Sequence, residues 1–150
     1  MATRSQVENG PNRGQDAERR WNAAAEGRRG LRTALRVNAA FSGASGLVIA
    51  VASSVLPGLL GAGTTTLYLV IGVFLVAFAV RLALLARGES ISRSEALMIV
   101  AGDWGWVAGS AAVIGMGLLT PLGTVLVGAT ALVVGSFAVW QGRNLPRERG

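Results

Sequence analysis

One aspartate lies inside a segment that otherwise has the composition of a membrane-spanning helix. In "AGDWGWVAGS", residues 101–110, Asp103 is the one charged residue, and no other charge occurs between Ala96 and Leu119. A charged side chain at membrane depth costs about 2.5–3.5 kcal/mol on insertion scales, so this carboxylate requires a compensating partner, a proton or a function. The chemistry open to it is a link between helices, or the binding and release of a proton.

A cationic partner for Asp103 is present in the sequence. Arg81 is the only arginine within an apolar span, and it lies at nearly the same depth as Asp103, roughly 10 Å below the membrane surface. The sequence therefore predicts an ion pair between Arg81 and Asp103. Gln141 is expected nearby, at the membrane edge.

Other polar residues recur on two helical faces. At about 100° per residue, Asp103, Trp106 and Ser110 fall on one face of their helix, and Asn38 and Ser42 share a face of an earlier helix. Such faces either clamp helices together through hydrogen bonds or line a path for an ion or a substrate, and the sequence leaves both interpretations open. The candidate intramembrane polar cluster consists of Asn38, Ser42, Arg81, Asp103, Trp106 and Ser110.

Small residues form a second set of faces beside the polar ones. Small side chains allow the backbones of neighbouring helices to approach closely, and they are enriched where membrane helices pack. The sequence predicts helix packing through Gly43, Gly46, Gly102, Gly105 and Gly109.

Lysine, histidine and cysteine are absent from all 150 residues, and their absence excludes several kinds of chemistry. Haem with a histidine or thiolate ligand, iron–sulfur clusters and the usual structural zinc sites all need residues that this chain lacks. Lysine Schiff bases and the common nucleophile and base pairs are excluded for the same reason. A single carboxylate inside the spans makes neither an aspartyl dyad nor a strong metal site. We therefore expect no enzyme, no cofactor and no metal.

The apolar residues predict four membrane-spanning helices. Hydrophobic residues make up 51% of the chain and charged residues 15%, and the mean hydropathy is +0.49. At about 1.5 Å rise per residue, runs of about 20 apolar residues match the roughly 30 Å core of a bilayer. The expected fold is an all-α, integral membrane, antiparallel four-helix bundle at residues 37–142, with helices at about 37–56, 67–86, 96–119 and 122–140.

The arginines predict how this bundle is oriented. Eight of the 14 precede Val37, two lie in a connector at Arg87 and Arg93, and three follow Trp140, while the other two turns have none. Cytoplasmic loops carry the excess of positive charge in multi-pass proteins, so both termini are expected in the cytoplasm. Because every basic residue is arginine, a usage associated with GC-rich bacterial genomes, we expect the bacterial cytoplasmic membrane.

The first 36 residues form a basic tail that divides in two. Its first 15 residues are polar and contain Gly, Pro and Asn, which predicts disorder. The remainder combines Ala, Glu and Arg in helical proportions and predicts an amphipathic surface helix with Trp21, Leu31 and Leu35 toward lipid. Its arginines either only satisfy the positive-inside rule or also bind anionic headgroups. A short cytoplasmic tail is expected at 143–150, and nucleic-acid binding is not expected.

Three motifs resemble a known family. They are "NAAFSGASG" (38–46), "DWGWVAGS" (103–110) and "QGRNL" (141–145), and they are similar to the pattern of small, uncharacterised, bacterial four-helix integral membrane proteins. The resemblance covers roughly residues 31–145 and implies architecture without an activity. Arg81 is not part of the family pattern.

These observations lead to two functional hypotheses. The first is a non-enzymatic membrane protein, an accessory subunit of a larger membrane complex or a self-associating scaffold, because small-residue faces accept other helices and reactive side chains are lacking. The second is a small proton-coupled transporter, with Asp103 as the exchangeable carboxyl and Trp106 as an aromatic wall.

Overall fold

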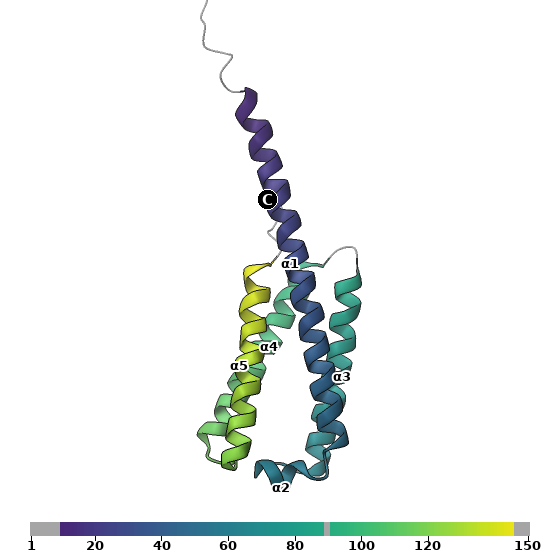
Figure 1. The fold of residues 1–150 in the computed structure, drawn as a ribbon, viewed down its shortest axis with the longest axis vertical. Helices are drawn as coiled ribbons and strands as arrows, with labels where there is room; N and C mark the ends of the chain where they lie inside the picture. Colours follow the sequence, from purple (N-terminus) through teal and green to yellow (C-terminus); the bar gives the residue numbers. More distant parts are fainter. Residues whose placement is uncertain (1–9, 89–90, 146–150) are drawn as a thin grey trace, which may run out of the picture.

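The computed structural model describes residues 10–88 and 91–145, and every regular element in those two ranges is a helix (Figure 1). Four helices, α1, α3, α4 and α5, are long and apolar enough to cross a membrane. The chain is therefore all-helical, as predicted, with the candidate spans of a multi-pass membrane protein. In chain order the helices are α1 (Gly10–Val51), α2 (Leu56–Leu60), α3 (Thr65–Arg87), α4 (Arg93–Gly115) and α5 (Pro121–Arg143).

Local side-chain chemistry sets where the later helices begin and end. The side chain of Thr64 accepts a backbone N–H in the first turn of α3, and Ser92 forms a capping box with Glu95 at the start of α4. Gly117 has a φ of 67°, a conformation that disfavours any residue with a side chain. Helix α4 therefore ends at Gly115, before the predicted end at residue 119.

The first span also ends earlier than predicted. Helix α1 stops at Val51, not at residue 56, and the chain turns into α2, which Gly61 closes with a φ of 88°. This connection is tied to the start of α5. The Thr120 N–H donates to the Leu60 carbonyl at 2.9 Å, and the Thr120 hydroxyl donates to the Leu59 carbonyl at 2.7 Å.

Helix α1 begins much earlier than the sequence predicted. It starts at Gly10, inside the stretch expected to be disordered, and runs unbroken past Val37, extending beyond the other helices (Figure 1). Residue 36 is therefore not a structural boundary. The outer parts of the two predicted tails, residues 1–9 and 146–150, lie outside the described residues.

The bundle already packs before the predicted first span. Leu31 and Leu35 are fully buried, whereas Trp21 is 69% exposed. The expectation that both leucines face lipid is wrong, because α1 continues as one helix through this region and packs them against residues of α3 and α4. The buried cluster at this end of the bundle contains Leu31, Leu35, Ala39, Leu82, Ala86, Ala96 and Ile99.

The long helices form two closely packed pairs. Helix α1 packs mainly on α3, and α4 mainly on α5, while contacts between α1 and α5 join the pairs. Large apolar side chains remain exposed along all four long helices. In water this exposure would be unfavourable, but lipid tails are as apolar as leucine, so the same surface is compatible with a bilayer.

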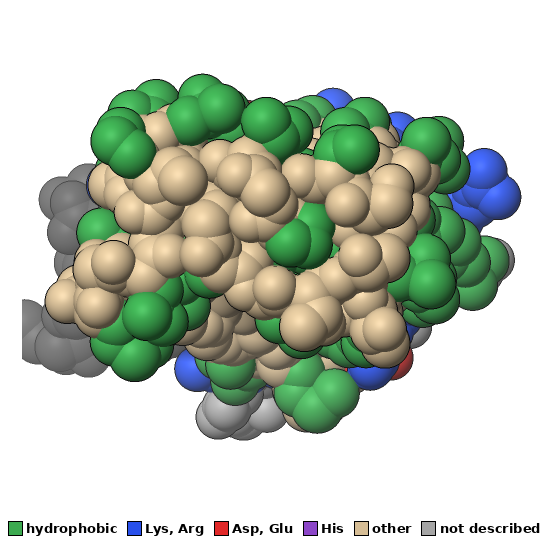
Figure 2. Space-filling view, turned by 90° about the horizontal axis from the view of Figure 1, so that it is seen from below, with side chains coloured by type: hydrophobic (Ala, Val, Ile, Leu, Met, Phe, Trp, Pro, Cys, Tyr) green, Lys and Arg blue, Asp and Glu red, His purple; other side chains and the backbone are tan. Residues whose placement is uncertain are grey.

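The end of the bundle that carries α2 has no cluster of basic charge. Seen from this end, apolar side chains, other side chains and backbone cover the centre of the surface, and basic side chains appear only at its margin (Figure 2). The turns here, residues 52–64 and 116–120, contain no Asp, Glu, Lys or Arg.

Candidate functional site

Asp103 links three helices through one oxygen atom. It lies on α4 and is only 4% exposed. Its Oδ2 accepts a hydrogen bond from Asn38 Nδ2 of α1 at 2.9 Å and another from Gln141 Nε2 of α5 at 3.1 Å. Two neutral amides therefore hold the carboxylate, and they come from helices far apart in the sequence.

Ser42 extends this arrangement by one turn of α1. Its hydroxyl donates to Asn38 Oδ1 at 3.0 Å, which leaves the Asn38 amide nitrogen to donate to Asp103. The four side chains Asn38, Ser42, Asp103 and Gln141 are all buried, and we call them the polar layer. Because unpaired polar groups are costly in an apolar interior, the layer favours one rotation of each of α1, α4 and α5 about its axis.

Two buried atoms, one within the polar layer and one on a neighbouring residue of α4, have no hydrogen-bond partner among the described residues. They are Gln141 Oε1 and Trp106 Nε1, one acceptor and one donor. Trp106 lies one helical turn beyond Asp103 on the same face of α4. These two atoms retain capacity to bind a further polar group next to the carboxylate.

The structure does not bring Arg81 to Asp103. The Arg81 side chain is exposed, and the hydrogen bonds that Asp103 accepts come from Asn38 and Gln141. At about 100° per residue, Arg81 lies roughly opposite the buried face of α3. That face, which determines how α3 turns in the bundle, consists of Gly72, Ala79, Leu82 and Ala86.

Not all remaining residues of the predicted cluster lie at the polar layer. Ser110 is buried two turns beyond Asp103, and none of the described hydrogen bonds connects it to the polar layer. Gln141, expected only at the membrane edge, is a direct partner of Asp103. In the sequence, Gln141 lies at nearly the same expected membrane depth as Asn38 and Asp103. That similarity in depth could have indicated that Gln141 belongs to the layer.

The predicted packing glycines behave in two different ways. A Cβ on Gly46 would lie 2.7 Å from the carbonyl oxygen of Gly72, so α1 and α3 touch through their backbones there, and a Cβ on Gly43 would lie 3.3 Å from the Ala79 Cβ. The sequence did not predict Gly72 as a packing residue, because no other glycine on its face of α3 marks that face as a packing surface. The predicted packing glycines of α4 lie against no neighbouring helix of the described structure. A Cβ would meet nothing within 4 Å at Gly102, Gly105 and Gly109.

The donor set around Asp103 suits hydrogen bonding better than metal binding. Within residues 10–88 and 91–145 no three Asp, Glu, His or Cys side chains lie together, so the neighbouring oxygens are those of amides and a hydroxyl. No family model, curated protein or solved structure matches this chain. The resemblance to small four-helix membrane proteins stays a prediction.

Proposed function

We propose that this chain is a non-enzymatic integral membrane protein that serves as an accessory subunit or scaffold of a larger membrane assembly, which includes assemblies of its own copies. In this proposal α1, α3, α4 and α5 cross the bacterial cytoplasmic membrane as an antiparallel bundle with both termini in the cytoplasm. The four apolar helices support it. So does the absence of charge in the turns at the α2 end, because arginine-free turns belong on the outer side.

The open glycine face of α4 carries the proposal. Gly102, Gly105 and Gly109 fall within one narrow side of the helix, and none of the helices that the structure describes covers them. Close backbone approach across such faces is how helices associate in lipid, where no hydrophobic driving force acts between them. The face is therefore suited to a helix from another subunit.

The polar layer supports a structural role. Asn38 of α1 and Gln141 of α5 both donate to Asp103 of α4, and Ser42 fixes the orientation of Asn38. A bundle whose helices are held in this way presents the α4 face in a fixed orientation. This is what a scaffold requires.

Filling the glycine face should weaken association. In Gly105→Leu/Gly109→Leu, two bulky side chains keep a partner helix away, and we expect association to weaken by about tenfold or more. The measurement is the mass of the purified protein in mild detergent, by analytical ultracentrifugation, together with the proteins that co-purify from native membranes.

Gly115→Leu is the matched control. Gly115 lies on another side of α4, and a Cβ there also meets nothing within 4 Å. This variant should associate as the wild type does. A wild-type protein that is monomeric and carries no other membrane protein would contradict the proposal, as would equal behaviour of the two variants.

A second candidate function is a small proton-coupled transporter, and one observation favours it. Asp103 is held by neutral amides, and beside it Trp106 Nε1 and Gln141 Oε1 still have bonding capacity. A buried carboxylate with an aromatic neighbour is suited to exchange a proton for a lipophilic cation.

The transporter candidate predicts a specific loss in Asp103→Asn. Proteoliposomes containing a pH-sensitive dye would be given tetraphenylphosphonium or ethidium, and cation-driven proton release should fall more than about tenfold, as expected when an essential proton carrier is removed. Ser110→Ala, on the same face outside the polar layer, should retain the flux. Absence of proton movement in the wild type with both cations would exclude this candidate.

A further inference from the structure

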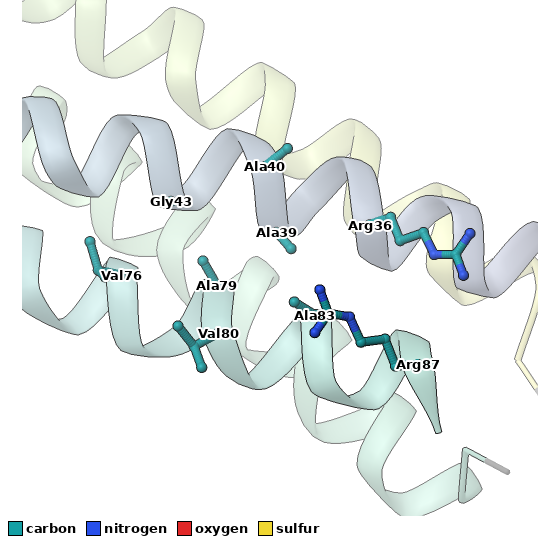
Figure 3. Close-up of a pocket in the computed structure, with 9 residues that line it drawn as sticks. All are labelled: Arg36, Ala39, Ala40, Gly43, Val76, Ala79, Val80, Ala83 and Arg87. Atoms are coloured by element: carbon teal, nitrogen blue, oxygen red, sulfur yellow. The ribbon is translucent and has the colours of Figure 1, made fainter. Parts of the chain in front are cut away.

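A groove of about 450 Å³ runs along the outer surface between α1 and α3 (Figure 3). Small residues dominate its lining, and they include Gly43, where a Cβ would lie 3.3 Å from the Ala79 Cβ. Large side chains are few along it, so the surface is hollowed where the two helices meet. The lining residues are Arg36, Ala39, Ala40, Gly43, Val76, Ala79, Val80, Ala83 and Arg87.

Two arginines from different helices stand at the same end of this apolar groove. Arg36 belongs to α1 and Arg87 is the last residue of α3, and Figure 3 shows both at the end of the groove away from Val76. Both side chains are exposed. The groove therefore has an apolar lining along its length and positive charge at one end.

We propose that this groove binds one anionic phospholipid, with the phosphate at Arg36 and Arg87 and an acyl chain along the small residues toward Val76. Guanidinium groups bind phosphate oxygens in a fixed, bidentate geometry, and two of them on neighbouring helices define a headgroup position. The acyl chain then covers apolar surface that no side chain of the bundle covers. This goes beyond a scaffold role, because it assigns a specific lipid to a specific pair of helices.

A lipid fits the groove better than a second copy of the chain. Membrane proteins of one kind insert in one orientation, so a second copy would bring its own arginines to the same end. Its cationic residues would then face Arg36 and Arg87, and like charges repel. An anionic headgroup supplies the opposite charge.

The test uses the full chain in phosphatidylcholine proteoliposomes that contain phosphatidylglycerol or phosphatidylcholine spin-labelled near the acyl end. Electron paramagnetic resonance measures the fraction of label whose motion the protein restricts. We expect the wild type to favour phosphatidylglycerol by at least about fivefold, and Arg36→Gln/Arg87→Gln to show almost no preference. Ala40→Leu, which fills the groove and keeps both charges, should also lose the restricted phosphatidylglycerol.

The matched control is Arg19→Gln/Arg20→Gln, which removes two exposed arginines of α1 outside the groove. It should keep the wild-type preference. An equal loss in this control would mean that diffuse charge attracts the lipid, and the proposal would fail. It would fail as well if the wild type showed no preference. Efficient disulfide cross-linking of Ala40→Cys in this cysteine-free chain would show a second copy in the groove and would also overturn it.

Discussion

Gly72→Val should destabilise the bundle strongly, by about 3 kcal/mol. A Cβ at this position would lie 2.6 Å from the Ala50 backbone nitrogen and 2.6 Å from the Gly46 carbonyl oxygen. Both are main-chain atoms of α1, so no side-chain rotation relieves the clash. The two helices must separate, and the contacts along their whole interface weaken with them.

Thermal unfolding in detergent, followed by circular dichroism, measures this loss. Gly102→Val is the control, because it places the same β-branched residue in a helix where a Cβ meets nothing within 4 Å. Helix propensity favours valine over glycine there by only a few tenths of a kcal/mol, so this variant should be about as stable as the wild type. Equal destabilisation in the two variants would show that α1 and α3 do not pack through Gly46 and Gly72.

Asp103→Leu should be the most damaging change in the polar layer, with a loss of about 2 kcal/mol. Leucine has a similar size but accepts no hydrogen bond, so the Asn38 and Gln141 amides lose the acceptor they share. Asp103→Asn keeps an oxygen at the same place and should lose less. The unfolding measurement is the same, with Ser110→Ala as a control in the same helix.

A double-mutant cycle separates this network from simple packing. If Asn38 bonds to Asp103, then Asn38→Leu and Asp103→Leu together should cost clearly less than the sum of the two single changes. Strictly additive losses would contradict the hydrogen-bonded layer. So would an Asp103→Leu variant as stable as the wild type.

Part of the site could be predicted from the sequence, and part could not. Helical periodicity and depth placed Asp103, Asn38 and Ser42 on polar faces of their helices, and in the structure Asn38 is hydrogen-bonded to both of the others. The same reasoning paired Asp103 with Arg81, because opposite charges at one depth attract. Depth alone does not specify rotation, and the buried face of α3 turns Arg81 to the other side.

The glycines show the same limit. The sequence predicted two glycine-rich faces, one on the first span and one on the third. It did not predict which helix would pack against each face. In the fold the first is filled by α3 through Gly72, and the second is left open on α4. Their sequence patterns are alike, and only the arrangement of the helices distinguishes an internal contact from an available surface.

The sequence by itself determined that four long apolar helices form, because hydropathy is a property of each residue that sums over about 20 positions. It also determined where turns interrupt them, since Gly, Pro and capping residues act through their own backbone. The tertiary structure decided how far α1 continues, which face of each helix is buried, and that Gln141 in place of Arg81 meets Asp103. Those outcomes depend on the rotation of each helix against its neighbours, which is set by contacts between residues far apart in the chain.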